Sequence, residues 1–386
     1  MSRVCSIFSQ LLQLFSRADF ELAVKQHKAE RHARGFTCWG QFIAMLFCQL
    51  GRAHSLNEIT QGLAASEGKL KHLGVPTAPK RSTLAYANQH RPWELYQTVF
   101  GQLLVRCQQL AAEGKRKFRF KNKLLSLDAT VIDLCLELYD WAQFCRTKGA
   151  IKLHLLLDHD GYLPSFACVT EGKVHEIRMA RQMRFDPGTI VVFDRGYTDY
   201  EWFAKLHEQG VFWVTRLKNN ADYVVVEKRK LSHHLMRRDE IIGLTALAKA
   251  DQELFLRRIV VWDEVNRKEL VLLTNHLQFA ASTIANIYRE RWQIELFFKA
   301  LKQSCKIKTF VGTSANTVKT QVWTALIAML ILRYLQLKAR YGWHLANLVA
   351  LLRQQLFVHR DLWLWLDEPF QPPPLPSEQQ LPLIPA

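Results

Sequence analysis

The spacing of apolar positions in the first hundred residues is typical of helices. One helix is predicted from about Trp39 to Gly51. A second should begin at Ser55-Leu-Asn-Glu58, which has the form of a capping box. A third is predicted to be capped by Ser82 and to end at Pro92. Residues 1–110 are therefore expected to form an all-α domain.

The pattern changes to strands at residue 124. Leu124 to Ile132 is an apolar run with one acid in its middle, which predicts a buried strand. Residues 151–169 predict two more strands, joined at the turn Asp160-Gly161. A helix over 174–184 and a short apolar strand over 189–194 follow.

The next segment alternates helix and strand. Thr198-Asp-Tyr-Glu201 is a second capping box, expected to open a helix that Gly210 closes. Val211 to Arg216 predicts another strand. The order from residue 124 is then strand, two strands, helix, strand, helix, strand. This order indicates an α/β class, with a mixed sheet flanked by helices.

Residues 218–276 interrupt that alternation. Strands are predicted at 222–227, 254–262 and 269–274, which together indicate a β-rich insertion. Long helices are expected at 282–304 and 317–340, and the tail after residue 368, with seven of the twelve prolines, should be extended or disordered. The expected organisation is a helical domain (1–110), a basic linker (111–123), a core in two parts (124–217 and 277–340), the insertion (218–276), and a C-terminal helix with a Pro-rich tail (341–386).

The charge of the chain indicates a class of binding partner. The chain of 386 residues has a net charge of +17, and residues 1–123 hold 19 lysines and arginines against seven acids. Such a balance indicates a polyanion, either nucleic acid or an anionic membrane surface. Lys80 and Arg81 at the start of the third helix favour DNA binding. A plain helical domain with a solvated basic face is the alternative.

The basic run at 115–123 holds six positive charges and no acid. It could form an edge strand or a linker, and it could contact phosphates or simply be solvated.

A membrane or secreted protein is not expected. The longest apolar run, Val322 to Leu332, stops at Arg333 and has about half the length that a bilayer requires. The N-terminus lacks the features of a signal peptide. The eight cysteines form no CxxC pair, which argues against structural zinc and fits a reducing, cytoplasmic location.

Two acids occupy unusual positions in the predicted core. Asp128 interrupts an apolar strand, where a charge is costly unless it is paired or binds a metal. Asp194 ends a strand, the place where open α/β sheets bind ligands. For either acid alone, a salt bridge or a helix cap is the simpler interpretation.

A third acid lies on the predicted helix 282–304. Glu295 falls on one narrow stripe with Tyr288, Arg291 and Lys302, because their spacing of three, four and seven residues follows the helical repeat. The simpler interpretation is an exposed face on which Glu295 pairs with Arg291.

Taken together, Asp128, Asp194 and the run Tyr288–Lys302 resemble the DDE transposases of bacterial insertion sequences. The run fits the subgroup defined by the signature Y-(2)-R-(3)-E-(6)-K. Residues 194–197 and 215–218 are also similar to that family's second-acid motif and the strand after it. The resemblance covers about residues 124–340. It implies an RNase H-like core with a β-rich insertion between the second and third acids, preceded by a helical DNA-binding domain.

The resemblance also implies a mechanism. Asp128 would bridge two Mg²⁺ ions, for which Mn²⁺ can substitute, while Asp194 and Glu295 would hold one ion each. Water would cut at the transposon end, and the resulting 3′-OH would form a hairpin before joining target DNA. Double-stranded DNA is the implied partner, with a homodimer in the synaptic complex. The implied DNA contacts are Tyr288, Arg291 and Lys302. Arg195 and Tyr197, in the turn after Asp194, and Arg216 are further candidate DNA contacts.

Other interpretations stay open. The chain could be another RNase H-like nuclease or integrase, or a catalytically silent regulator that binds DNA. A protein of the membrane surface is a more distant alternative. Glu176 is a rival ligand for the metal. Trp262 and Trp292 could stack on bases, although core packing is the simpler expectation for both.

Overall fold

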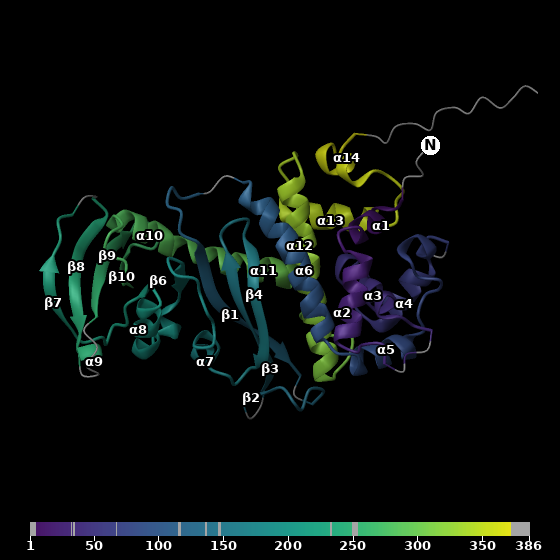
Figure 1. The fold of residues 1–386 in the computed structure, drawn as a ribbon, viewed down its shortest axis with the longest axis horizontal. Helices are drawn as coiled ribbons and strands as arrows, with labels where there is room; N and C mark the ends of the chain where they lie inside the picture. The colour runs from purple at the N-terminus through teal and green to yellow at the C-terminus, as the bar shows by residue number, and fades with distance from the viewer. Residues whose placement is uncertain are drawn as a thin grey trace, which may run out of the picture.

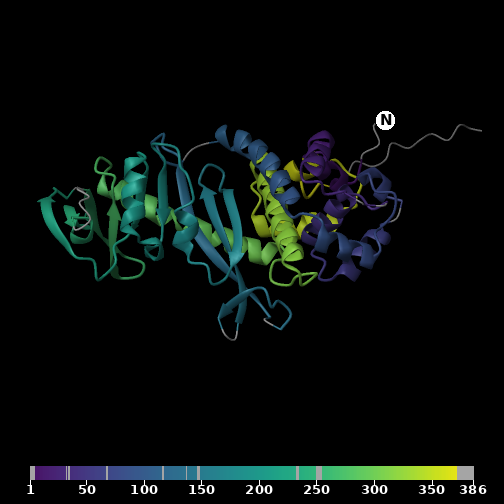
Figure 2. The same ribbon diagram turned by 60° about the horizontal axis from the view of Figure 1, so that its bottom comes forward.

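The computed structural model describes residues 5–31, 33, 35–66, 68–114, 117–135, 137–145, 148–231, 234–248 and 254–371. The expected Pro-rich tail beyond residue 371 and Lys115–Arg116 of the basic run lie outside these residues. Helices from both ends of the chain gather at one end of an elongated molecule, and a strand-rich region forms the other (Figures 1 and 2).

The N-terminal region is helical, as predicted. In the third predicted helix, the cap was wrong. The helix begins at Arg81, directly after Pro79-Lys80, so that Ser82 lies inside its first turn and caps nothing. Ser55 does cap its helix, accepting a hydrogen bond from the Glu58 N–H at 3.1 Å. The helices are α1 (Ile7–Leu12), α2 (Arg17–Gln26), α3 (Cys38–Leu50), α4 (Leu56–Ala64), η1 (Leu70–Leu73), α5 (Arg81–His90) and α6 (Glu94–Ala112).

C-terminal helices complete this helical part: α12 (Ala315–Lys338), α13 (Leu345–Gln355) and α14 (Leu362–Asp367). By length and composition α12 could cross a membrane, but 83% of its apolar window is buried inside the protein. It packs against α3, α5 and α6. The apolar run at 322–332 is thus a core helix. The two chain regions are also joined at Gln10, whose side chain bonds to Arg360 O and to Leu362 N.

The predicted mixed sheet centres on β1 (Leu124–Leu134). This strand pairs antiparallel with β3 (Lys148–Asp158) and parallel with β5 (Ile190–Phe193). β4 (Leu163–Glu171) forms a hairpin with β3 through the predicted turn, and β6 (Phe212–Arg216) lies parallel to β5. The strand order β4-β3-β1-β5-β6 is that of an RNase H-like core. A short strand, β2 (Gln143–Cys145), also pairs with β3. The described part of the basic run, 117–123, forms bends and no strand.

The segment predicted as a β-rich insertion extends the same sheet, in the order β6-β10-β9-β8-β7. The predicted strands correspond to β7 (Tyr223–Lys228), β9 (Phe255–Asp263) and β10 (Lys268–Thr274). The sequence prediction missed β8 (Met236–Leu244) and the short α9 (Thr245–Ala248). β8 opens with four charged residues in succession, 237–240, which look like a solvated loop. In the structure Asp239 and Glu240 are buried because they pair with Arg257 and Arg258 of β9.

Two helices of the core differ from prediction. The helix expected over 174–184 is the short α7 (Glu176–Ala180), in which only Ala180 is buried, so little packing holds a longer helix. The next helix, α8 (Tyr200–Glu208), is capped by Asp199, which accepts from the Trp202 N–H at 2.9 Å. The expected cap, Thr198, instead donates to Arg195 O. Gly210 closes the turn with φ of +68°, as predicted.

The long helix expected over 282–304 is two helices, α10 (Ala281–Glu290) and α11 (Trp292–Ser304), which meet at Arg291. α10 covers one face of β5 and β6, together with Val192 and Val214. α8 covers the other face, together with Phe193 and Trp213. α11 runs past β1 toward the helical end of the molecule (Figure 1).

Candidate active site

Asp128 and Asp194 occupy matching places on neighbouring strands. In the parallel pairing of β1 with β5, Leu127 lies opposite Phe193, and each acid is the next residue along its strand. Neighbouring strands are about 4.8 Å apart. The fold therefore brings the first two predicted acids to adjacent positions at the carboxyl end of β5.

Glu295 reaches the same place through Arg291. The guanidinium Nη2 of Arg291 lies 2.6 Å from Glu295 Oε1, and its Nη1 lies 3.5 Å from Asp128 Oδ2. The Arg291 side chain is only 15% exposed. The pairing of Glu295 with Arg291 that the helical spacing allowed is present, and it extends to the acid on β1.

The Asp128 carboxyl is difficult to ionise. Burial raises its pKa to about 6, and the nearby carboxylates of Glu295 and Glu176 act in the same direction. The Ala129 N–H, which donates to Asp128 at 2.8 Å, and the Arg291 guanidinium oppose the shift. Several carboxylates thus compete for one small region, an arrangement that a cation would stabilise.

Glu176 belongs to this region. Its Oε1 lies 3.4 Å from the Nζ of Lys152, and its Oε2 lies 3.8 Å from the point that a Cβ at Gly196 would occupy. Burial raises the pKa of the Tyr197 hydroxyl, and the carboxylates of Asp128, Glu176 and Asp194 contribute in that order. The helix α7 therefore supplies a fourth acid near the three predicted ones.

A cavity of about 400 Å³ opens beside Asp128 and Glu295. Lys302 lines it and donates from Nζ to Val131 O at 2.9 Å. Lys299 and Lys308 also line it, and sequence reasoning missed both. Lys299 could have been found from the sequence, because it lies one helical turn after Glu295. Cations beside carboxylates suit a phosphodiester backbone that approaches a metal site.

Tyr288 and Arg216 lie near the second acid. Burial raises the pKa of the Tyr288 hydroxyl, the Asp194 carboxylate adds to this shift, and Arg291 and Arg216 oppose it. The guanidinium of Arg291 lies 5.8 Å from the centre of the Tyr288 ring. The structure thus places Tyr288, Arg291 and Arg216 around the site, although the Tyr288 side chain is buried.

The turn after Asp194 separates its two predicted DNA contacts. Arg195 is exposed. Tyr197 is 1% exposed and packs against Phe193, and its hydroxyl has no hydrogen-bond partner among the described residues. A direct contact of Tyr197 with DNA would require this turn to open.

The two tryptophans differ in exposure. Trp292 is 55% exposed, so the expectation that it packs in the core was wrong. It precedes Glu295 by one helical turn, which leaves its ring accessible at the start of α11. Trp262 is half-buried, and the guanidinium of Arg237 lies 5.8 Å from its ring centre.

The acids suit a hard divalent cation because carboxylate oxygens are the ligands that Mg²⁺ prefers. In the described part of the chain, no three His, Cys, Asp or Glu side chains are close enough together to hold a metal ion. Arg291 lies between Asp128 and Glu295 and supplies positive charge there. Metal binding by all three acids therefore requires the guanidinium to move.

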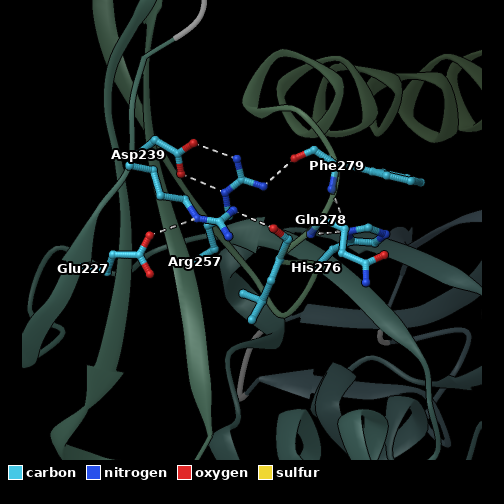
Figure 3. Close-up of polar contacts among 8 residues, drawn as sticks. Glu227, Asp239, Arg257, His276, Gln278 and Phe279 are labelled. Carbon is cyan, nitrogen blue, oxygen red and sulfur yellow. Dashed lines mark hydrogen bonds and ion pairs between the residues drawn. The ribbon is translucent and has the colours of Figure 1, made fainter.

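A buried polar network fixes the start of α10 (Figure 3). Arg257 of β9 forms two hydrogen bonds with the Asp239 carboxylate, at 2.7 and 2.6 Å, and also donates to Phe279 O. Arg229 donates to Leu277 O. His276 Nδ1 accepts from the backbone N–H groups of residues 278 and 279. The extended sheet thus holds the loop that leads into α10, and with it the position of Arg291.

Comparison with known proteins identifies the family of this chain. Residues 119–331 match the family model described as "Transposase DDE domain", and residues 4–76 match a domain of unknown function (DUF4372). The chain is 30% identical over 292 residues to "Putative transposase y4zB" of Sinorhizobium fredii, covering 74% of this chain and 80% of the relative. It is 25% identical over 258 residues to "Probable transposase for insertion sequence element IS5377" of Geobacillus stearothermophilus, covering 66% and 67%.

Among solved structures, the piggyBac transposase in a synaptic complex with hairpin DNA aligns over 92% of this chain and 81% of its own. The TM-score is 0.45 and the identity is 9%, so this likeness is too distant to bear on function.

An RNase H-like core of this topology is typical of a class of nucleic-acid-processing enzymes. The transposase domain spans more than half of the chain, and the chain belongs to the DDE transposase family of insertion sequences. Membership implies action on DNA and dependence on a divalent metal.

Proposed function

We propose that this chain is an active transposase, which cuts DNA at the ends of its element and joins those ends to a target. The observation that carries the proposal is the arrangement of Asp128, Asp194 and Glu295 around Arg291 and the carboxyl end of β5. Asp128 and Asp194 lie at matching places on β1 and β5, and Arg291 links Glu295 to Asp128. The family relationship supports the same conclusion.

The three acids are the proposed ligands: Asp128, Asp194 and Glu295 would hold the Mg²⁺ ions. Bound ions would activate the attacking oxygen and stabilise the leaving oxygen of the phosphodiester. The raised pKa of Asp128 fits a group that is ionised most readily when a cation is near. Glu176 is the alternative metal ligand, because its carboxylate lies close enough to raise the pKa of Asp128.

The basic residues would hold the DNA. When Arg291 leaves the two acids, its guanidinium is free to bind a phosphate next to the cut. Lys302 lines the cavity beside Asp128 and Glu295. Arg195 is exposed beside Asp194, and Arg216 lies near Tyr288. These side chains are the proposed contacts to the transposon end.

The proposed reaction has two kinds of step. In the first, a water oxygen attacks phosphorus at the transposon end, the bond to the 3′ oxygen breaks, and a 3′-OH and a 5′-phosphate result. In the second, that 3′-OH attacks the opposite strand, which closes a hairpin and releases the flanking DNA. Water reopens the hairpin, and the 3′-OH then joins to a target phosphodiester.

Two transposon ends must meet before joining. Each chain offers one such site, so two chains are needed for two ends. A homodimer on double-stranded DNA is therefore the proposed assembly, and the basic N-terminal helices are its proposed DNA-binding region.

Cleavage of DNA that carries the element's own ends tests the proposal. The wild type should nick the end boundary with Mg²⁺ or Mn²⁺, and Asp194→Ala should not. Asp186→Ala is the matched control, because this exposed acid precedes β5 whereas Asp194 follows it. Tight DNA binding without cleavage by the wild type would instead identify a silent regulator. Normal cleavage by Asp194→Ala would remove that acid from the site.

A further inference from the structure

A second cavity, of about 570 Å³, lies next to the catalytic one. Gln303 of α11 lines both cavities. The second is also lined by Arg52 from the loop between α3 and α4, by Ser304 at the end of α11, and by Arg353 and Gln354 of α13. N-terminal, catalytic and C-terminal segments therefore meet around one hollow, where α13 packs against both α3 and α11 (Figure 1).

The described lining of this cavity carries two positive charges, those of Arg52 and Arg353. No acidic side chain is among its described lining residues, and neither Arg52 nor Arg353 forms an ion pair in the described structure. Lys306 lies behind it, with its Nζ against the ring of His54. Burial lowers the pKa of Lys306, the positive charges of Arg52 and Arg353 lower it further, and Cys48 and Glu58 oppose the shift. A bound anion at the cavity would relieve the repulsion that Arg52 and Arg353 exert here.

The backbone of Arg52 supports a role for its side chain. Its φ is +57°, in the left-handed region that favours glycine. A glycine here would relieve the strain but would remove the guanidinium from the cavity. A strained residue that brings a charge to a cavity is a mark of function.

We propose that this second cavity binds a backbone phosphate of duplex DNA, next to the phosphate that lies at the three acids. Arg52 and Arg353 would contact its oxygens, with Gln303, Ser304 and Gln354 as hydrogen-bond donors. The continuity through Gln303 selects DNA over other anions, because a duplex entering the catalytic cavity must continue past α11. This inference rests on the proposed function, since it assumes that the chain acts on DNA ends.

The salt dependence of DNA binding tests the cavity. The probe is a duplex of the element's terminal sequence, with binding measured over a range of KCl concentrations without divalent metal. Each phosphate contact contributes about 0.9 to the slope of log affinity against log salt. Because both arginines would contact the same phosphate, the double variant Arg52→Gly/Arg353→Gln should reduce that slope by about this amount, and each single variant by part of it. Arg52→Gly should also melt at the wild-type temperature or higher, because it removes backbone strain.

Arg267→Gly is the matched control. Arg267 has a similar φ of +51° and the same charge, but lies in the turn between β9 and β10, far from α13 (Figure 1). Its slope should equal that of the wild type. Unchanged slopes for Arg52→Gly and Arg353→Gln, or an equal reduction for Arg267→Gly, would overturn the cavity proposal. Metal-dependent cleavage by the wild type is measured separately, so failure of the proposed function would be recognised by itself.

Discussion

Arg291 Nη1 lies 3.5 Å from Asp128 Oδ2, so a cation from the junction of α10 and α11 neutralises the first acid of the site. The same guanidinium bonds to Glu295. A metal ion and this arginine would supply positive charge to the same carboxylates. The position of Arg291 should therefore depend on whether metal and DNA are bound.

A substitution of Arg291 distinguishes its effect on metal binding from its effect on DNA cleavage. Arg291→Gln should keep or increase the affinity for Mn²⁺, measured by calorimetry, because no guanidinium competes for the acids. End cleavage should fall about tenfold or more, because a charge-assisted contact to phosphate is lost. Arg289→Gln, at an exposed neighbouring position, should leave both unchanged. Cleavage at the wild-type rate by Arg291→Gln would show that this residue does not act at the site.

The buried pair of Asp239 and Arg257 should be essential to stability. Asp239→Ala leaves a buried guanidinium without its partner, so the free energy of unfolding should fall by about 3–5 kcal/mol in urea titrations. Replacing both residues, as Asp239→Leu with Arg257→Met, should restore much of that loss. The exposed Glu227→Ala should cost less than about 1 kcal/mol. Equal effects of Asp239→Ala and Glu227→Ala would contradict the role of the buried network.

The cap of α8 can be tested with adjacent substitutions. Asp199→Ala removes the acceptor for the Trp202 N–H together with the ion pair to Arg181, and should lower stability by about 1–2 kcal/mol. Thr198→Ala removes only an exposed hydroxyl contact, and its effect should stay within about 0.5 kcal/mol. Thermal unfolding of both variants measures the difference. A larger loss for Thr198→Ala would instead support the capping box predicted from the sequence.

His276 should make the fold sensitive to acid. Burial lowers the pKa of its imidazole from 6.5 to about 4, and the charge of Arg257 adds to the effect. The unfolded chain therefore binds a proton more readily below pH 6.5, and stability should decline as the pH falls from 6.5 to 4.

Asn at position 276 keeps an acceptor for the backbone N–H groups of the loop but does not titrate. His276→Asn should therefore show a shallower loss of unfolding free energy between pH 6.5 and 4 than the wild type, even if it is less stable at pH 7. Parallel pH profiles for the two proteins would show that His276 does not contribute to this sensitivity. Residual pH dependence is expected from His154 and His159, whose pKa values burial also lowers to about 4.

The local sequence pattern was sufficient to predict most elements of the core. The apolar run around Asp128 and the one before Asp194 are continuous, so both strands could be predicted, and the spacing from Tyr288 to Lys302 indicated Glu295 as the proposed third acid. The ion pair between Arg291 and Asp128 could not be predicted, because it depends on how α11 crosses β1.

The other features that the sequence did not predict depend on residues that are distant along the chain. β8 was missed because Asp239 and Glu240 look solvated until Arg257 and Arg258 of the neighbouring strand are placed beside them. The second cavity was also invisible in the sequence, since Arg52 and Arg353 are distant along the chain. Local periodicity carries no information about such partners.

The hydrogen bonds between Gln10 and the segment 360–362 have a consequence for the synthesis of the protein. The first helices leave the ribosome long before α12 and α13, against which they pack, have been translated. A product that terminates before α12 therefore lacks the helix against which α3, α5 and α6 pack, as well as Arg353. Such a fragment should leave the apolar faces of these helices uncovered.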